Sequence, residues 1–279
     1  MAAISYDAPA VLAAFSKRHG ITFPLLSDVG SATIIRYGIL NTVAANVLGA
    51  GSADPLAVPR VAAEFRTLVS VNEPQARHRG IPFPGTFMLD RRGRVTSRFF
   101  EEFYRERSTV SNLMLRLGQG LPPVRATKMA TDHLEVTTYA SDATVALGNR
   151  FSLVLDIAPK PGMHVYAPGA SGYRVVALSV APQPFVRTLP TAFPPSDIYH
   201  FRPLDERVAV YQKPFRLLQE VVPEITPEAQ AALQGLDSLT LAGTLEYQAC
   251  DDTVCYNPVS MPLSWTVAIK PFVAGEPVP

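Results

Sequence analysis

The chain has 279 residues, of which 47% are hydrophobic and 18% are charged, a composition suited to packed cores and not to a disordered chain. The formal net charge is +1, from 25 basic and 24 acidic side chains, so no overall field steers the chain toward nucleic acid or an anionic membrane. No apolar run approaches the roughly 18 residues of a membrane span, and the first residues lack the basic start of a signal peptide. The length predicts two domains.

The first hundred residues alternate between extended and helical patterns. "AAISYD" (residues 2–7) predicts a short strand, and Asp7 is suited to cap a helix that begins at Pro9 and ends at Gly20. The face of this helix that we expect to be buried carries Val11, Leu12 and Phe15. "ITFPLL" (residues 21–26) predicts the next strand.

A second helix should follow, opened by Ser27 or Asp28. Its apolar side chains are Ile34, Ile35 and Tyr37. Residues 46–60 predict an insertion loop, and residues 61–71 predict a strand or a helix. Further on, "TFMLD", the turn "RRGR" and "VTSRFFEEF" predict a hairpin over residues 86–103.

A last helix of this part should begin at Ser108 or Thr109. Its inward side chains are expected to be Leu113, Met114 and Leu117. Strands that alternate with helices are typical of an α/β layer fold.

The composition changes at "GQGLPPVRATKMA", where glycines and prolines punctuate a short polar stretch. Such a stretch is typical of a linker. We therefore expect a first domain over residues 1–120, a linker over 121–130, a second domain over 131–272 and a tail over 273–279.

Beyond the linker, most segments alternate between apolar and polar residues. They are "FSLVLDI", "YRVVALSV", "AVYQKPFRLL", "LTLAGTLEYQA" and "VSMPLSWTVAI". In the last of these, every second residue from Val259 to Ile269 is apolar and the residues between them are small or polar. Such strands, separated by Pro- and Gly-rich turns, predict an antiparallel sandwich. Residues 239–269 should form a hairpin.

The only two cysteines, Cys250 and Cys255, fall at the tip of that predicted hairpin. Four intervening residues allow the two Cα atoms to lie within disulfide range. A ring this small stabilises a domain by only about 2 kcal/mol, which a full core hardly needs. Zinc binding would require a second ligand pair, and only the fold could bring His164 and His200 close. Reversible exchange is favoured, while the structural disulfide and the metal site stay open.

Asp251 and Asp252 lie between the two cysteines. Their negative charge disfavours a nearby thiolate, so the pair is poorly suited to attack a peroxide. A disulfide that waits for the thiolate of another protein, and then passes electrons on by exchange, fits these charges better. Alternatively, both aspartates only satisfy the backbone of the turn.

"GTLEYQACDDTVCYNPVSMPLSWTVAI" closely resembles the end of the N-terminal periplasmic domain of DsbD, the family of bacterial thiol:disulfide interchange proteins. "PKPGMHVYAPGASGYRVVALSV" resembles the same family, and the resemblance covers roughly residues 131–270. It implies an immunoglobulin-like sandwich in which Cys250 and Cys255 relay electrons from a membrane partner to periplasmic acceptors. Members of the family continue into a transmembrane domain, whereas this sequence contains no membrane span.

The same family shields its disulfide with a mobile loop that bears aromatic side chains. "IYHFRPLDERVAVYQKPF" occupies the corresponding place, so the resemblance suggests Tyr199 and Phe201 as shields. Four further side chains are expected to line the site: Tyr247, Tyr256, His164 and Tyr166. Each of these aromatic residues could instead be packed in the core or at its rim.

The first part closely resembles redoxins of the AhpC/TSA peroxiredoxin type. The segments that carry this resemblance are "AISYDAPAVLAAFSKRHGITFPLLSD", "YGIL", "GIPFPGTFMLDRRGRV" and "FFEE". The resemblance covers about residues 1–118 and implies a thioredoxin-like fold. Pro84 matches the proline that is cis in that fold and faces the active site. A trans proline at the start of a strand is the alternative.

In those redoxins the nucleophilic cysteine lies on a strand and helix that precede the segment corresponding to "AISYD". This chain has no cysteine before Cys250, so peroxidase activity is not expected from it. The missing strand would also be central, and its loss would expose apolar edges. We therefore expect an incomplete thioredoxin-like domain that lacks its first strand and nucleophile helix. Either the given start is internal to a longer protein, or the domain is degenerate.

The sequence thus predicts a thiol–disulfide oxidoreductase or electron-relay protein that uses a reversible Cys250–Cys255 disulfide, with no cofactor and no metal. Its partner should be a redox protein, either a thioredoxin-like domain or a membrane thiol reductase. Its location should be periplasmic if an upstream signal exists. Two alternatives remain. One is a non-catalytic binding module with a structural disulfide, and the other is a peroxiredoxin-like enzyme whose catalytic cysteine lies upstream.

Overall fold

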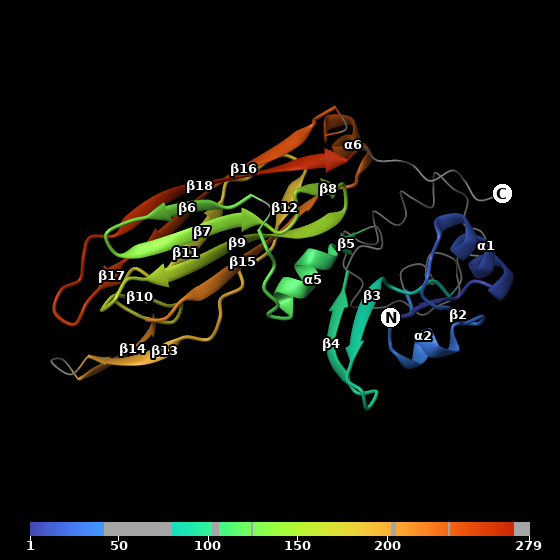
Figure 1. The fold of residues 1–279 in the computed structure, drawn as a ribbon, viewed down its shortest axis with the longest axis horizontal. Coiled ribbons are helices and arrows are strands. Elements are labelled where there is room, and N and C mark those ends of the chain that lie inside the picture. The colour runs from blue at the N-terminus through green and yellow to red at the C-terminus, as the bar shows by residue number, and fades with distance from the viewer. Residues whose placement is uncertain (42–79, 102–105, 124, 202–204, 234, 271–279) are drawn as a thin grey trace. The chain divides into compact units, whose positions relative to one another are not determined.

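The computed structural model of the chain describes residues 1–41, 80–101, 106–123, 125–201, 205–233 and 235–270. The chain divides into two compact units, Met1–Tyr104 and Arg105–Pro279 (Figure 1). The predicted insertion loop, the predicted strand or helix after it and the predicted tail all lie outside the described residues. No helix among the described residues is both long and apolar enough to cross a membrane.

In the described part of the first unit, strands and helices alternate as predicted. The elements are β1 (Ala3–Ser5), α1 (Pro9–His19), β2 (Leu25–Ser27), α2 (Ala32–Arg36), β3 (Gly85–Leu89) and β4 (Val95–Phe100). β1 and β2 pair in parallel, while β3 and β4 form the predicted antiparallel hairpin.

The ends of helix α1 follow the sequence signals only in part. Pro9 starts the helix and Gly20 ends it with a left-handed φ of 60°, as predicted. The N-cap residue, however, is Ala8 and not Asp7. The carboxylate of Asp7 instead accepts a hydrogen bond of 2.5 Å from the hydroxyl of Ser5, which leaves the helix without a side-chain cap.

The predicted apolar faces of the two helices are only partly buried. Leu12 of α1 and Ile34 of α2 are buried. The remaining predicted inward side chains are exposed: Val11, Phe15, Ile35 and Tyr37. A two-stranded sheet offers a narrow face, so a helix that packs on it covers one row of side chains. The N-cap residue of α2 is Ser31 and not the predicted Ser27 or Asp28, although the carboxylate of Asp28 accepts hydrogen bonds from the backbone of Thr33 and Ile34 in the first turn.

The expectation that Pro84 is a cis proline is wrong. The described residues contain no cis peptide bond, and Pro84 directly precedes β3. Its carbonyl accepts a hydrogen bond of 3.1 Å from the backbone of Glu101, which closes the end of the β3–β4 hairpin. The trans isomer is the lower-energy form of an X–Pro bond, and nothing in this hairpin requires the other.

The second unit is rich in β-strands. Its elements are β5 (Arg107–Ser108), α5 (Val110–Arg116), β6 (Thr127–Ala130), β7 (Leu134–Ala140), β8 (Thr144–Ala146), β9 (Asn149–Pro159), β10 (His164–Tyr166), β11 (Ala177–Val180), β12 (Val186–Thr188), β13 (Asp197–Phe201), β14 (Glu206–Tyr211), β15 (Phe215–Pro223), α6 (Pro227–Leu233), β16 (Ser238–Tyr247), β17 (Ala249–Cys250) and β18 (Val259–Lys270).

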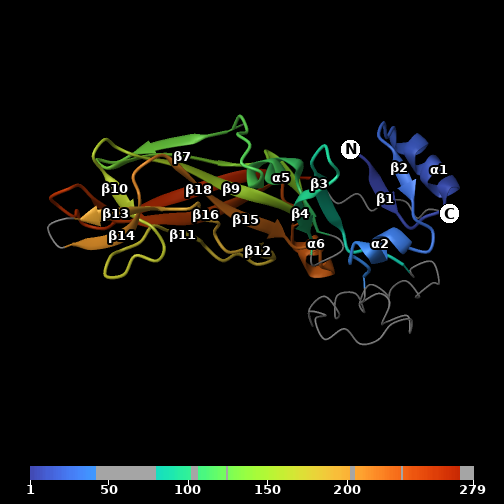
Figure 2. The ribbon, with the colours of Figure 1, turned by 90° about the horizontal axis from the view of Figure 1, so that it is seen from below.

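These strands form three sheets. One runs β12-β15-β9-β7-β6, with β5 added to β9, and a second runs β11-β16-β18-β8. A third runs β13-β14-β10-β17 and lies at one end of the unit (Figures 1 and 2). The first two sheets contribute to one hydrophobic core, whose largest members include Phe151, Leu241 and Trp265.

The predicted alternation of the last strand is confirmed. Met261, Leu263, Trp265, Val267 and Ile269 are buried, and the residues between them lie toward solvent. The indole N–H of Trp265 donates a hydrogen bond of 2.7 Å to the hydroxyl of Thr138, which ties β18 to β7 across the core. A buried donor without a partner would destabilise the fold, so this contact fixes how the two sheets meet.

Helix α5 belongs to the second unit, although the sequence places it at the end of the first domain. Thr109 caps it, as predicted. Its inward side chains are Asn112 and Leu115, while Met114 is exposed, so the predicted inward face is wrong. The reason is that the surface beneath the helix is partly polar. The division between the units precedes residue 106, whereas the predicted domain limits at 120 and 130 stay predictions.

Candidate functional site

The two cysteines lie in the connection between β16 and β18. These strands pair antiparallel as far as Tyr247 and Val259, so the predicted hairpin is confirmed. The connection does not project as an isolated tip, however. It contains β17, which pairs antiparallel with β10 and places Cys250 opposite His164. The cysteine segment is therefore held against a second sheet.

Cys250 and Cys255 form a disulfide with a Cα–Cα distance of 4.1 Å. The two residues differ sharply in exposure, because Cys250 is 1% exposed whereas Cys255 lies in the exposed part of the turn. Tyr166, Val208 and Val210 form a small buried cluster with Cys250. The bond thus has one buried end and one end near solvent, which spacing alone did not predict.

Tyr166 is the side chain that contacts both sulfur atoms. Its hydroxyl oxygen lies 3.2 Å from Sγ of Cys250 and 3.3 Å from Sγ of Cys255. A disulfide sulfur carries no hydrogen, so the phenol is the donor in these contacts. Burial, with smaller contributions from Tyr173 and Glu206, raises the pKa of Tyr166 far above its usual value. The phenol is therefore protonated at neutral pH.

Tyr173 and Glu206 support Tyr166 from neighbouring segments of the chain. The rings of Tyr166 and Tyr173 stack with centroids 3.9 Å apart. The hydroxyl of Tyr173 donates a hydrogen bond of 2.5 Å to the carboxylate of Glu206, the first residue of β14. This hydrogen bond raises the pKa of Tyr173, as does burial to a lesser degree.

His164 lies beside the disulfide and is 3% exposed. Its ring packs edge-on against Tyr166, at 5.6 Å, and tilted against Tyr199, at 4.7 Å. Burial lowers the pKa of His164, and the charges of Asp252 and Asp251 oppose that shift in part. The imidazole is therefore neutral at physiological pH.

The two aspartates have different partners. One carboxylate oxygen of Asp251 accepts 2.7 Å hydrogen bonds from the backbone of Thr253 and Val254, and the other accepts from the hydroxyl of Tyr256. The backbone hydrogen bonds of Thr253 and Val254 are the main reason that the pKa of Asp251 lies well below its usual value. Asp251 thus satisfies the turn backbone, as the alternative interpretation proposed. Asp252 instead accepts a 2.6 Å hydrogen bond from Tyr199.

Tyr199 reaches the site from the β13–β14 hairpin. It combines the hydrogen bond to Asp252 with the ring contact to His164, and its predicted role as a shield of the disulfide stays a prediction. Phe201 lies two residues further along β13, opposite Glu206. Tyr199 provides a side-chain hydrogen bond between this hairpin and the cysteine turn, and Val208 and Val210 of β14 share the buried cluster of Cys250.

The last two predicted lining residues lie at the base of the turn. Tyr247 is fully buried and its hydroxyl lies 2.7 Å from the hydroxyl of Thr131, so it is part of the core. Tyr256 packs its ring 4.3 Å from that of His133 and binds Asp251. Pro84 belongs to the first unit.

Sequence reasoning missed Tyr173 and Glu206. Both occur within segments already singled out for family resemblance, yet their role depends on β10 pairing with β14, which brings distant segments together. The metal alternative finds no support among the described residues, where no three His, Cys, Asp or Glu side chains gather. His200 instead pairs with Asp205 at 2.7 Å near the end of the β13–β14 hairpin.

Comparison with known proteins identifies two regions in the chain. Residues 1–98 match the family model described as the AhpC/TSA family. Residues 132–262 match the family model described as thiol:disulfide interchange protein DsbD, N-terminal. The chain therefore combines a thioredoxin-like AhpC/TSA region with a β-rich region of the DsbD N-terminal type. Together with the disulfide, this combination indicates a thiol–disulfide redox relay.

Two solved structures are similar to part of the chain. The DsbD N-terminal domain of Neisseria meningitidis in the reduced form is 15% identical, with 40% of this chain and 74% of that chain covered and a TM-score of 0.28. The N-terminal periplasmic domain of ScsB from Proteus mirabilis is 16% identical, with 50% of this chain and 49% of that chain covered and a TM-score of 0.34. No curated protein matches the chain.

Proposed function

We propose that the second unit is an immunoglobulin-like thiol–disulfide exchange domain in which Cys250 and Cys255 cycle between disulfide and dithiol. The observation that carries this proposal is the asymmetry of the bond. One cysteine is exposed, the other is buried, and the hydroxyl of Tyr166 lies within 3.3 Å of both sulfur atoms. A purely structural link needs neither an accessible end nor a donor aimed at its sulfurs.

The first step is attack on the exposed end. A thiolate of a partner protein attacks Sγ of Cys255, a new disulfide forms between the two proteins, and the Cys250–Cys255 bond breaks. The electron pair of that bond remains on Sγ of Cys250, which becomes a thiolate. Because Cys250 is buried, this thiolate is costly without a hydrogen-bond donor or a proton.

Tyr166 provides a hydrogen-bond donor for this thiolate. Its phenol is protonated at neutral pH and already lies 3.2 Å from Sγ of Cys250, so it can stabilise the leaving thiolate as the bond lengthens. The stacked ring of Tyr173 and the carboxylate of Glu206 fix the position of the phenol. His164 is neutral and forms an apolar, aromatic wall beside the sulfur.

The second step releases the partner. A second thiol of the partner attacks the partner's own sulfur in the mixed disulfide, and Sγ of Cys255 leaves as a thiolate that takes up a proton. The partner dithiol is thereby oxidised to a disulfide, and the Cys250–Cys255 disulfide is reduced to a dithiol. Two electrons and two protons pass from the partner to the cysteine pair. The reverse sequence passes the electrons to an acceptor disulfide.

The proposed partner is a protein with a reactive dithiol, either a thioredoxin-like domain or a membrane thiol reductase. A periplasmic location is proposed as well, because a disulfide that must reform persists in an oxidising compartment. We also propose that the redoxin-like region of residues 1–98 contributes no thiol of its own to this exchange. The chain has no cysteine before Cys250, and the described strands of the first unit form two separate pairs.

The test is the reduction potential of the pair together with exchange kinetics. Equilibration with defined glutathione or dithiothreitol buffers should give a potential in the range of exchanging pairs, above about −300 mV. In the Cys250→Ala variant, the thiol of Cys255 should attack the disulfide of an oxidised thioredoxin-type partner and stay joined to it as a mixed disulfide, because no second cysteine of the chain can release it. A potential below that limit, with no exchange, would instead support the rival function.

That rival is a binding module whose disulfide stays closed. The four hydrogen bonds that the carboxylate of Asp251 accepts inside the turn favour it, because they hold the disulfide ring in one conformation. The reduction potential of the Cys250–Cys255 pair decides between the two functions.

A further inference from the structure

Two carboxylates flank the exposed end of the disulfide. One oxygen of Asp251 accepts a hydrogen bond of 2.7 Å from the backbone N–H of Val254, and the other accepts one of 2.9 Å from the hydroxyl of Tyr256. Val254 and Tyr256 directly precede and follow Cys255 in the chain. The carboxylate of Asp251 is therefore bonded to both neighbours of the cysteine that we propose as the point of attack.

The second carboxylate belongs to Asp252, which is exposed. It accepts the 2.6 Å hydrogen bond from Tyr199, which holds it beside the turn. Both aspartates also affect His164, the residue paired with Cys250, because their charges oppose the lowering of its pKa by burial. The negative potential of the two carboxylates therefore reaches the residue opposite the buried cysteine.

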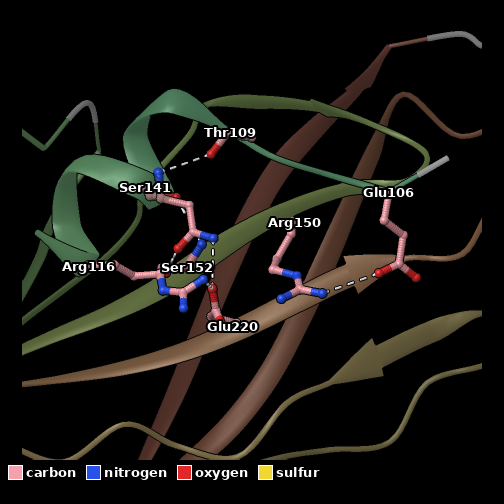
Figure 3. A network of polar contacts seen from close by, with 8 residues as sticks. Glu106, Thr109, Arg116, Ser141, Arg150, Ser152 and Glu220 are labelled. Atoms are coloured by element: carbon pink, nitrogen blue, oxygen red, sulfur yellow. Dashed lines mark hydrogen bonds and ion pairs between the residues drawn. The ribbon is translucent and has the colours of Figure 1, made fainter. Parts of the chain in front are cut away.

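A carboxylate elsewhere in the second unit is paired with two guanidinium groups. One oxygen of Glu106 lies 3.4 Å from a guanidinium nitrogen of Arg150, as Figure 3 shows, and the other pairs with Arg187. In the described part of the chain, neither Asp251 nor Asp252 forms an ion pair with a basic side chain. Their negative charges therefore act on a molecule that approaches the turn.

The attacking group in the proposed exchange is itself an anion. A thiolate forms a bond to Sγ of Cys255 and displaces Sγ of Cys250, which keeps the electron pair of the broken bond. The two carboxylates repel this thiolate. A positive charge beside the thiolate offsets the repulsion, and a further negative charge increases it. At about 7 Å in water, each pair of unit charges changes the rate by roughly threefold.

We infer that Asp251 and Asp252 select the exchange partner by charge. The partner presents basic side chains beside its reactive dithiol, and a dithiol flanked by acidic side chains is disfavoured. This inference rests on the proposed function for the existence of a protein partner. The charge preference itself belongs to the disulfide and the two carboxylates, so small thiols can measure it independently of that function.

Two small thiols of opposite charge test the preference on the full chain. Cysteamine carries an ammonium group, and 3-mercaptopropionate carries a carboxylate. The quantity measured is the charge ratio, which is the rate of disulfide reduction per thiolate with cysteamine divided by that with 3-mercaptopropionate. Raising the salt concentration from about 0.01 M to about 1 M shortens the screening length from about 30 Å to about 3 Å, and should lower the charge ratio about fivefold. The intrinsic reactivity of each thiolate cancels in this comparison.

Matched variants separate the charge of Asp252 from its hydrogen bond. Asp252→Asn removes both, and should lower the charge ratio about threefold at low salt. Tyr199→Phe removes only the hydrogen bond, so the rates with both thiols should change by one common factor and the ratio should stay the same. Glu228→Gln removes an exposed charge from α6, which lies at the opposite end of the second unit from β17 (Figure 1). It should also leave the ratio unchanged.

The inference is wrong if Asp252→Asn leaves the charge ratio unchanged, or if Glu228→Gln lowers it by the same factor. It is also wrong if Tyr199→Phe lowers the ratio as much as Asp252→Asn does, because the hydrogen bond and not the charge would then be responsible.

Two dithiol peptides extend the test to the chemistry of the partner. Each has two cysteines separated by two glycines, with a lysine on either side in one peptide and a glutamate on either side in the other. At low salt, the lysine peptide should reduce the native disulfide about tenfold faster per thiolate, and Asp252→Asn should reduce this advantage about threefold. Equal rates for the two peptides would overturn the inference, even if thioredoxin-type proteins exchange with the pair. A charge preference together with a reduction potential below about −300 mV would overturn the proposed function alone.

Discussion

The phenol of Tyr199 donates a 2.6 Å hydrogen bond to the carboxylate of Asp252, and this contact joins the β13–β14 hairpin to the turn that holds the disulfide. Residues 53 positions apart are brought together in this way. Tyr199 also packs on His164, which lies opposite Cys250. The Tyr199–Asp252 hydrogen bond therefore holds the hairpin against the cysteine turn. We expect the access of a reductant to Cys255 to depend on this hydrogen bond.

Removing this hydrogen bond should speed reduction of the disulfide. Tyr199→Phe and Asp252→Asn are each expected to raise the rate at which dithiothreitol reduces the disulfide, by about three- to tenfold. The reason is that an exposed, charge-assisted hydrogen bond contributes on the order of 1 kcal/mol. The double variant should show no further gain, because both changes break one contact. Rates equal to those of the native chain in both single variants would contradict the link.

The two single-cysteine variants should differ in reactivity. In Cys250→Ala the remaining Cys255 is exposed, whereas in Cys255→Ala the remaining Cys250 is buried. Modification by a small aromatic disulfide reagent, followed by absorbance, should be at least tenfold faster for Cys255. Similar rates would show that burial does not distinguish the two sulfurs in solution, and the proposed order of attack would fail.

Tyr166→Phe should slow opening of the disulfide by roughly tenfold at neutral pH, because the buried leaving thiolate loses its hydrogen-bond donor. Tyr173→Phe keeps the stacked ring and should slow opening of the disulfide by a smaller factor, since it removes only the hydrogen bond to Glu206. Stopped-flow mixing with a reduced partner over a range of pH measures both. An unchanged rate and pH profile in Tyr166→Phe would assign the phenol a packing role alone.

His164 should make the second unit less stable in acid. Its folded pKa lies below the unfolded value of about 6.5, so the unfolded chain binds a proton more readily between these two values. The free energy of unfolding should therefore rise with pH through that window and level off above it. Urea unfolding of the native chain and His164→Phe between pH 5 and 8 checks this. Parallel curves for the two proteins would show that His164 does not contribute.

Thr138→Val should destabilise the second unit by about 1–3 kcal/mol, because the buried indole N–H of Trp265 would lose its acceptor while the core volume stays similar. Thr240→Val is the control. Thr240 shares an exposed hydrogen bond with Thr266, and its loss should change stability by less than about 0.5 kcal/mol. Thermal unfolding followed by Trp265 fluorescence measures both.

Much of the fold could be predicted from local sequence patterns. The two-residue period between Val259 and Ile269 gave the buried face of β18, and the turn "RRGR" gave the β3–β4 hairpin. Pro9, Gly20 and Thr109 marked helix ends that the structure confirms. These signals succeed because they depend on backbone preferences and on which side of one element is apolar.

The inward face of α5 shows where such patterns fail. Its leucines and methionine suggested an apolar face, yet Asn112 is the fully buried residue, because Ser152 and Glu220 lie beneath it. A buried polar side chain is predictable only from its partners, and these lie 40 and 108 residues away in the chain.

By itself, the sequence determined that the chain has two parts, that the second is built from alternating strands, and that its two cysteines share one short turn. Only the tertiary structure decided that Cys250 is buried and Cys255 is exposed, that Tyr166 contacts both sulfurs, and that Tyr199 reaches the turn. The physical reason is that periodicity reports the faces of a single element. Which neighbour covers a given face depends on strand pairings such as β10 with β17, between residues far apart in the chain.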